Sequence, residues 1–184
     1  DLVLALGGTC VMASLNSVGI AGLLALRRHA QLPIHAHRNG WGYLSRHPAL
    51  GFDYSAWSVF WRLAGADHMH VNGLSNKFCE PDESAIASAR ALLQPLDAAH
   101  PCCAMPVFSS GQSARQVHGT WDALGTPDLI FAAGGGIMGH PDGPAAGVRA
   151  IRDAWDAAMA GIPLARAAAG SPALAAAIAG RIHS

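Results

Sequence analysis

The chain has 184 residues, of which 51% are hydrophobic and 13% charged, and its formal net charge at pH 7 is +0. A chain of this length and hydrophobic content can bury a core, which excludes an intrinsically disordered class. No run of basic residues occurs, and this excludes an electrostatic nucleic-acid-binding surface. Ten histidines are many for this length, and imidazole can act as a base, as a metal ligand or as a hydrogen-bond donor to phosphate.

A membrane segment is the first possibility to consider, because no charged side chain occurs between Leu2 and Leu26. Such a run is long enough to span a bilayer. However, Gly7-Gly8 and several polar residues divide it into a strand-like run and a helix-like run, so we expect no membrane association. The sequence shows neither the charged region nor the cleavage site of a signal peptide.

The cysteines have the spacing of neither a zinc site nor a disulfide framework. They are Cys10, Cys79, Cys102 and Cys103. Free thiols are typical of a reducing compartment, so we expect a cytoplasmic location.

Short apolar runs alternate along the chain with longer segments of helical spacing. The strand-like runs cover residues 9–16, 32–38, 66–71, 104–111 and 128–136. The helix-like segments cover residues 18–30, 54–65, 82–96 and 145–161, and an Ala-rich tail from Gly161 adds two helices separated by a Ser-Pro break. Repeated strand–helix units predict a parallel sheet with helical crossovers.

The predicted fold class is therefore α/β. Both a (β/α)8 TIM barrel and an open doubly wound sheet place the ligand at the carboxyl ends of the strands, and periodicity does not separate them. A complete barrel needs about 250 residues. Five units in 184 residues predict the C-terminal part of a barrel, about strands four to eight. On this interpretation residues 1–184 form one partial barrel domain, and the first barrel strands are absent.

Two H-x-H motifs lie at predicted strand ends. His35 and His37 in "HAHRNG" share one strand face because side chains repeat every two residues, and Arg38 follows them. The motif "DHMH", residues 67–70, repeats this spacing. Converging imidazoles and a guanidinium suit a phosphate or a carboxylate. H-x-H on a barrel strand is also a ligand pattern of metal hydrolases, and histidines packed inside a barrel are a third interpretation.

The stretch "AAGGGIMGHPDG", residues 132–143, runs from an apolar strand into a glycine-rich turn. Successive glycine N–H groups can form a concave anion site, and barrels commonly bind phosphate in the loops after their last two strands. A strand-to-helix turn often needs glycine in any case. Together with "SSG", residues 109–111, on the preceding strand, the run predicts a phosphate-bearing ligand.

Lys77 is the single lysine among twelve basic residues. It follows the third strand in "VNGLSNKF", where Gly73, Ser75 and Asn76 predict a mobile loop. Lysine places a compact charge on a flexible stem, which suits one small anionic group. An ordinary surface lysine is the alternative.

Taken together, the chain resembles the catalytic C-terminal domain of the RuBisCO large-subunit superfamily. The matching stretches are "LPIHAHRNG", "RLAGADHMHVNGLSNKF", "MPVFSSG" and "FAAGGGIMGHPDGPAAGVRA", in family order and spacing. The resemblance covers nearly the whole chain. It implies barrel strands four to eight, in agreement with the fold expected from length and periodicity, and it also implies an N-terminal domain that is absent from residues 1–184.

The resemblance also implies residue roles. His37 would face the reacting carbons, and Lys77 would lie on a loop that closes over the substrate carboxylate or CO2. The remaining residues would bind the substrate. Arg38 and His70 would bind one phosphate, Ser109 a hydroxyl, and Gly134 and Gly135 a phosphate through their N–H groups, with help from Gly111.

Three departures from RuBisCO proper favour a RuBisCO-like protein of the form IV type. Trp41 replaces a further histidine, Ser110 replaces a glycine, and the run "VMASLN" lacks an expected His-Asp pair. Trp41 predicts a narrower pocket, which disfavours a five-carbon bisphosphate. Retention of Arg38, His70 and Lys77 favours a decarboxylase or transcarboxylase/hydrolase of the 3-oxo-isoapionate 4-phosphate type. Ribulose-bisphosphate carboxylase and a methionine-salvage enolase or isomerase remain alternatives.

Under this resemblance, a phosphorylated 3-oxo sugar acid would lose its carboxylate through an enediolate. Mg2+ would stabilise the enediolate, and His37 would relay a proton to it. The Mg2+ ligands, a carbamylated lysine with Asp and Glu, are expected in the missing upstream part, because Lys77 is the only lysine here. The family also implies a homodimer. A non-catalytic remnant and a two-metal H-x-H hydrolase are alternatives from other classes.

Overall fold

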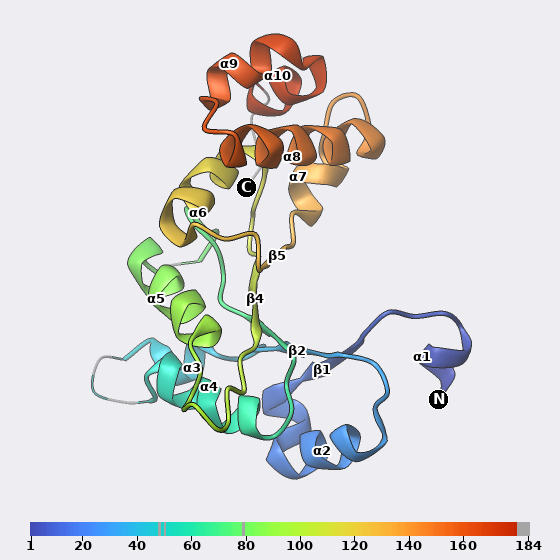
Figure 1. Cartoon of the computed structure of the whole chain (residues 1–184), viewed down its shortest axis with the longest axis vertical. Helices are drawn as coiled ribbons and strands as arrows, with labels where there is room; N and C mark the ends of the chain where they lie inside the picture. The colour runs from blue at the N-terminus through green and yellow to red at the C-terminus, as the bar shows by residue number, and fades with distance from the viewer. Residues whose placement is uncertain (48, 50, 79, 180–184) are drawn as a thin grey trace. The chain divides into compact units, whose positions relative to one another are not determined.

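The computed structural model describes residues 1–47, 49, 51–78 and 80–179 (Figure 1). It divides into two compact units, which we call the first and the second unit. The first unit consists of Asp1–His70 and Ala87–Pro106, and the second of Val71–Ile86 and Val107–Ser184. Helix α5 (Asp82–Leu93) and strand β4 (Met105–Phe108) each contribute residues to both units.

The strands and helices follow the predicted alternation. The other elements of the first unit are α1 (Leu2–Ala5), β1 (Val11–Ser14), α2 (Leu15–His29), β2 (Ile34–His37), α3 (Gly42–Ser45), α4 (Tyr54–Leu63) and β3 (His68–His70). Those of the second unit are η1 (Ala114–Gln116), α6 (Val117–Leu124), β5 (Ile130–Phe131), α7 (Gly134–Met138), α8 (Pro144–Met159), α9 (Leu164–Gly170) and α10 (Pro172–Ala179).

Five strands make one sheet in the order β1-β2-β3-β4-β5, which is also their order in the chain. In the first unit β1 pairs with β2 and β2 with β3, both in parallel. In the second unit Val107 and Phe108 of β4 pair in parallel with Ile130 and Phe131 of β5. Parallel strands joined by helices confirm the predicted α/β class.

Strand β2 shows why its histidines lie on one face. Ile34 and Ala36 are fully buried, whereas His35 and His37 are only partly buried on the opposite face. Side chains alternate along a strand, so the apolar residues pack under the helices and the imidazoles face the other way. The H-x-H spacing therefore presents two imidazoles on one side of the sheet.

Asp67, the first residue of the "DHMH" motif, has a structural role. Its carboxylate accepts a hydrogen bond from the Ile34 N–H at 2.7 Å and from the Arg27 guanidinium at 2.7 Å. These bonds join the residue before β3 to the start of β2 and to the last turn of α2. In this motif the Asp67 carboxylate therefore links three elements, whereas the two histidines belong to β3 itself.

The core of the second unit rests on one face of α8. Ala150 and Ala154 are buried there beside Val117 of α6 and Leu174 of α10. Small side chains let helices approach closely, and in Figure 1 α9 and α10 lie against α8. The Ala-rich tail therefore forms two packed helices around the break at Ser171-Pro172, as predicted.

Two details differ from the sequence predictions. The glycine run is not an open turn, because α7 begins at Gly134 and only Ile130–Phe131 is strand. The apolar periodicity of the sequence also did not predict a helix after β4, where the structure has η1 and α6. Ser113 and Gln116 cap this segment reciprocally, so its start is fixed by side-chain hydrogen bonds rather than by apolar periodicity.

Within the part of the chain that the structure describes, no helix combines the length and the apolar character needed to cross a bilayer.

Candidate anion-binding site

Four imidazoles lie on one face of the β2–β3 ladder in the first unit. His35 is aligned with His68, and Ala36 with Met69, so the alternating residues of both strands share faces. The imidazole face carries His35, His37, His68 and His70. The two H-x-H motifs therefore lie side by side on adjacent strands.

The closest contact in this cluster joins His35 to His70. Their Nε2 atoms are 2.8 Å apart, and their ring centroids are 4.8 Å apart. The His37 ring lies 4.6 Å from that of His70, and the His68 ring lies 5.6 Å from that of His35. Since a hydrogen bond between two nitrogens needs one donor and one acceptor, the two Nε2 atoms share one proton.

Burial keeps the centre of this cluster neutral at pH 7. Burial, and then the charges of His37, His35 and Arg38, lower the pKa of His70 from 6.5 to about 3. The pKa of His35 is also lowered, first by burial and then by His68 and His37. Neutral imidazoles can each donate one hydrogen bond and accept another, which suits contacts to phosphate or hydroxyl oxygens.

Arg38 follows β2 directly and is only 6% exposed. Its guanidinium carbon lies 4.9 Å from the ring centroid of Tyr54 and 5.9 Å from that of Trp41. Both distances lie within the range of cation–π attraction. Arg38 therefore brings a buried positive charge to the carboxyl end of β2, next to the imidazole face.

Trp41 belongs to the aromatic cluster that surrounds this charge. It is 8% exposed and packs edge-on against Tyr54, with 5.4 Å between ring centroids. The Trp57 ring is tilted against it, with 4.8 Å between centroids. The structure thus places the indole in contact with Arg38 and with helix α4. The predicted narrowing of the substrate pocket by Trp41 stays a prediction.

In the second unit, the loop that carries Lys77 is tied to the loop after β4. The Lys77 N–H donates to the Ser110 carbonyl at 3.0 Å, and the Lys77 ammonium lies 5.5 Å from the centroid of the Phe78 ring. The Lys77 side chain is exposed. The backbone is thus fixed at this point, while the charge at the end of the side chain reaches solvent.

Ser110 adopts a left-handed conformation with φ of +69°. This region favours glycine, and a side chain there needs a compensating contact. The Ser110 hydroxyl donates to the Asn72 side-chain oxygen at 2.8 Å, and Asn72 also has a positive φ of 65°. The Ser109 N–H donates to the Asn72 carbonyl at 3.1 Å, and the hydroxyls of Ser109 and Ser110 are 3.4 Å apart. Asn72 thus holds the "SSG" segment.

Two glycines of this region are required by close packing or by backbone conformation. A Cβ on Gly73 would lie 2.2 Å from the side chain of Gln112, so this position has no room for a larger residue. Gly111 has a φ of +93°, and a Cβ there would lie 3.7 Å from the Lys77 side chain. Both glycines therefore help to bring the Lys77 loop close to the loop after β4.

The glycine run forms the first turn of α7. A Cβ on Gly136 would lie 2.8 Å from the Gln112 carbonyl, so α7 begins in close contact with the loop after β4. Around Gly134 and Gly135 a Cβ would meet nothing within 4 Å. The N–H groups of a helix's first turn have no acceptor inside the helix. The predicted anion contacts of Gly134 and Gly135 would thus come from a helix start and not from a free turn.

The predicted site residues accordingly form two groups. The first unit brings together His37, Arg38 and His70 at the carboxyl ends of β2 and β3. The second unit brings Lys77 next to the segment Ser109–Gly111 and packs the start of α7 against the residues that follow it. The convergence of both groups on one ligand stays a prediction.

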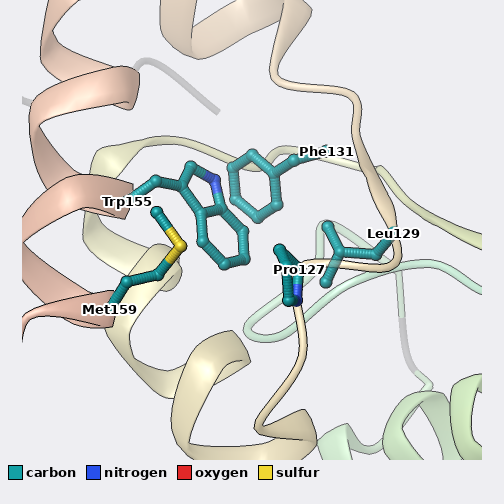
Figure 2. A pocket seen from close by; sticks show the side chains of 5 residues that line it. All are labelled: Pro127, Leu129, Phe131, Trp155 and Met159. Carbon is teal, nitrogen blue, oxygen red and sulfur yellow. The ribbon is translucent and has the colours of Figure 1, made fainter.

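An apolar pocket of about 240 Å³ lies elsewhere in the second unit. Figure 2 shows it between the residues that precede and form β5 and the last turns of α8. Its lining consists of Pro127, Leu129, Phe131, Trp155 and Met159. None of these lining residues is titratable, and none is among the residues predicted to bind phosphate.

The described residues do not form a metal site. Residues 1–47, 49, 51–78 and 80–179 contain no group of three His, Cys, Asp or Glu side chains that could hold a metal ion. The imidazole face offers nitrogen, whereas Mg2+ prefers oxygen ligands. The two-metal hydrolase interpretation of the H-x-H motifs therefore has no support here, and these residues do not fit Mg2+. Cys10, Cys102 and Cys103 are free thiols, and Cys79 lies outside the described residues.

Sequence reasoning did not select Tyr54, His35 or Asn72 as site residues. Tyr54 donates a hydrogen bond from its hydroxyl to the His70 carbonyl at 2.7 Å, and its ring contacts Arg38. The sequence offered one indication for Tyr54, because a hydroxyl-bearing aromatic residue stands at the start of an otherwise apolar helix face. His35 was visible in its motif, but only the packing shows that it contacts His70.

Known proteins are similar to nearly the whole of this chain. Residues 1–180 match the family model described as ribulose bisphosphate carboxylase large chain, catalytic domain. A 3-oxo-isoapionate-4-phosphate transcarboxylase/hydrolase of Xanthobacter autotrophicus is 62% identical over 174 residues, which cover 95% of this chain and 42% of that protein. A 3-oxo-isoapionate-4-phosphate decarboxylase of Rhizobium etli is 49% identical, over 97% of this chain and 43% of that protein.

The crystal structure of a rubisco-like protein from Burkholderia fungorum superposes with a TM-score of 0.94 at 50% identity, and the match covers 98% of this chain and 45% of that chain. The chain thus spans less than half the length of the relatives that it matches. Its five-stranded parallel sheet corresponds to the C-terminal part of a RuBisCO-type barrel. The chain belongs to the RuBisCO large-chain family, within the catalytic domain.

Proposed function

We propose that the protein carrying this chain is a carbon–carbon lyase that acts on a phosphorylated oxo sugar acid. The substrate class is that of the relatives, whose names specify decarboxylation or transcarboxylation and hydrolysis of 3-oxo-isoapionate 4-phosphate. The observation that carries the proposal is the cluster of His37, Arg38 and His70 at adjacent strand ends. A buried guanidinium beside the neutral His70 imidazole suits a phosphorylated ligand.

In the first unit, Arg38 and His70 bind the substrate phosphate, and His37 faces the reacting carbons. The buried guanidinium supplies charge-assisted hydrogen bonds, which are stronger away from water. His37 lies 4.6 Å from His70 between ring centroids, so a ligand held by His70 lies within reach of His37. We assign to His37 the proton transfer to the carbanionic product of carbon–carbon cleavage.

In the second unit, the exposed Lys77 steadies the departing carboxylate, and Ser109 binds a substrate hydroxyl. The N–H groups of Gly134 and Gly135 contribute to binding the single phosphate of this substrate, and Gly111 lies close to the Lys77 loop. An ammonium on a flexible stem can follow a carboxylate as the bond to it breaks. Closure of this loop would exclude water from the intermediate.

The family's Mg2+ stabilises enediolate charge when bound, and its ligands are predicted to lie upstream of this chain. The residues described here do not fit that ion, so their own roles are binding, orientation and proton transfer. A homodimer and a cytoplasmic location belong to the same proposal. The family assignment supports the homodimer. The free thiols of Cys10, Cys102 and Cys103 support the cytoplasmic location.

The test is a substrate screen with the full-length protein and added Mg2+. The candidates are 3-oxo-isoapionate 4-phosphate, methylthioribulose phosphate and ribulose bisphosphate, and CO2 release or uptake is followed. We expect CO2 release, or release of a carboxylated fragment, from the first compound only. Turnover of ribulose bisphosphate with CO2 uptake would replace the proposal with a carboxylase. Isomerisation or enolisation of either other compound would replace the lyase proposal with a methionine-salvage enolase or isomerase. Inactivity on all three compounds would support a non-catalytic remnant.

A further inference from the structure

Tyr54, the first residue of α4, contacts both residues that we assign to the substrate phosphate. Its hydroxyl donates to the His70 carbonyl at 2.7 Å, and its ring centroid lies 4.9 Å from the Arg38 guanidinium carbon. We propose that Tyr54 is a positioning residue that holds Arg38 and His70 in one geometry for binding a phosphoryl group. This inference rests on the proposed function and adds a residue to it.

Tyr54 is itself held firmly. It is 6% exposed, and Asp53 caps the helix that it begins by accepting hydrogen bonds from the Ser55 and Ala56 N–H groups. Its ring packs edge-on against Trp41 at 5.4 Å and lies 5.6 Å from the Trp57 ring. A side chain packed in this way has a fixed position relative to α4, and it can therefore fix the groups that it contacts.

The two contacts act on different parts of the site. The hydroxyl binds the backbone carbonyl of the last residue of β3 and so fixes the strand end from which the His70 imidazole projects. The ring attracts the guanidinium and limits where it can lie. Phenylalanine would preserve the second effect and abolish the first, so the two can be separated by mutation.

A structural role alone would not require the hydroxyl to meet this particular carbonyl. A buried tyrosine needs one hydrogen-bond partner, and many carbonyls could serve. Here the partner belongs to one anion-binding residue while the ring contacts the other. The juxtaposition of both contacts on one side chain points to positioning of the pair.

The experiment measures equilibrium binding of inorganic phosphate to the full-length protein by calorimetry. The variants are Tyr54→Phe and Tyr54→Leu. The matched control is Phe60→Leu on the same helix, because the Phe60 side chain is 59% exposed and belongs to none of the contacts described above. We expect the dissociation constant to rise about threefold to tenfold in Tyr54→Phe and more than tenfold in Tyr54→Leu. The control should stay within about twofold.

The outcomes separate this inference from the proposed function. If the unaltered protein binds phosphate and both Tyr54 variants bind it equally well, Tyr54 does not position the pair and the phosphate site stands. If the variants lose thermal stability but their folded forms bind phosphate normally, its role is structural only. If the unaltered protein does not bind phosphate, the anion site and this inference fall together. Should Tyr54→Leu not fold, the comparison of Tyr54→Phe with the control decides.

Discussion

His35 and His70 share a hydrogen bond between their Nε2 atoms at 2.8 Å. His35 begins one H-x-H motif and His70 ends the other, so the bond crosses from β2 to β3 diagonally on the imidazole face. Only one of the two nitrogens can carry the shared proton. The protonation state of the residue assigned to phosphate binding therefore depends on a neighbour that is not assigned to the ligand.

Replacing His35 by Ala should raise the pKa of His70. The substitution removes a neighbouring imidazole and admits water, and both changes weaken the causes that lower this pKa to about 3. A titration of the imidazole NMR signals of the full-length protein measures the shift. His29→Gln, at an exposed position on α2, is the control. An unchanged His70 titration in His35→Ala would contradict the shared-proton arrangement.

The free energy of unfolding should fall as the pH is lowered from 6.5 toward 3. The lowered pKa values of His70 and His35 mean that the unfolded chain binds more protons than the folded chain in this window. Stability therefore rises with pH there and is highest above 6.5, with a limiting slope of about 1.4 kcal/mol per pH unit for each histidine.

Urea unfolding at several pH values measures this slope. His70→Asn should make it shallower between pH 6.5 and 4.5, because one of the two responsible groups is removed. His29→Gln again serves as the control and should keep the original slope. Equal slopes in His70→Asn and the unaltered protein would show that the cluster does not govern acid stability.

Lys77→Ala should lower kcat of the full-length enzyme more than tenfold, which corresponds to about 1.4 kcal/mol of barrier. The side chain is exposed, whereas its backbone is hydrogen-bonded to Ser110, so the substitution should leave folding intact. Lys77→Arg tests whether any cation suffices or a compact ammonium is needed. A loss smaller than tenfold in Lys77→Ala would remove this residue from the mechanism.

Arg62→Met should destabilise the protein by about 3 kcal/mol, because a hydrogen-bonded guanidinium is lost and carbonyls are left unsatisfied. Arg62 is 5% exposed and donates to the carbonyls of Cys102 at 2.6 Å, Ala91 at 3.0 Å and Gln94 at 2.6 Å. It therefore satisfies the carboxyl end of α5. Thermal unfolding measures the change, and Arg28→Met, at an exposed position, should have little effect.

Gly73→Ala should also destabilise, by about 1–3 kcal/mol, because its methyl group would overlap the buried Gln112 side chain. Gln112 donates to the Leu74 carbonyl at 3.0 Å, so the clash would disturb the start of the Lys77 loop. Gly170→Ala is the matched control, since a Cβ there meets nothing within 4 Å. Equal thermal midpoints for the two variants would show that the loop can move aside.

Much of the site follows from local patterns. The alternation of strand residues places His35 and His37 on one face, and an apolar run before a polar or glycine residue marks each strand end. These rules depend on neighbours in the chain, so the sequence carries them directly. The family motifs, whose spacing spans nearly the whole chain, then predict which residues bind the ligand.

Contacts between distant residues could not be inferred in this way. Periodicity gives Tyr54 a place in a helix but does not indicate that its hydroxyl reaches the His70 carbonyl. Similarly, the sequence indicates only that Ser110 is a polar loop residue. The structure shows its left-handed backbone conformation and its hydrogen bond to Asn72. Such contacts depend on how separate elements pack, and no local rule encodes that packing.

The sequence by itself thus determined the order of strands and helices, the α/β class, the paired H-x-H motifs and the family. Tertiary structure alone decided that His70 is the imidazole with the strongly lowered pKa, that Arg38 lies among aromatic rings and that α7 begins within the glycine run. The reason is physical: burial and hydrogen bonding are set by residues far apart in the chain, whereas periodicity reports only on neighbours.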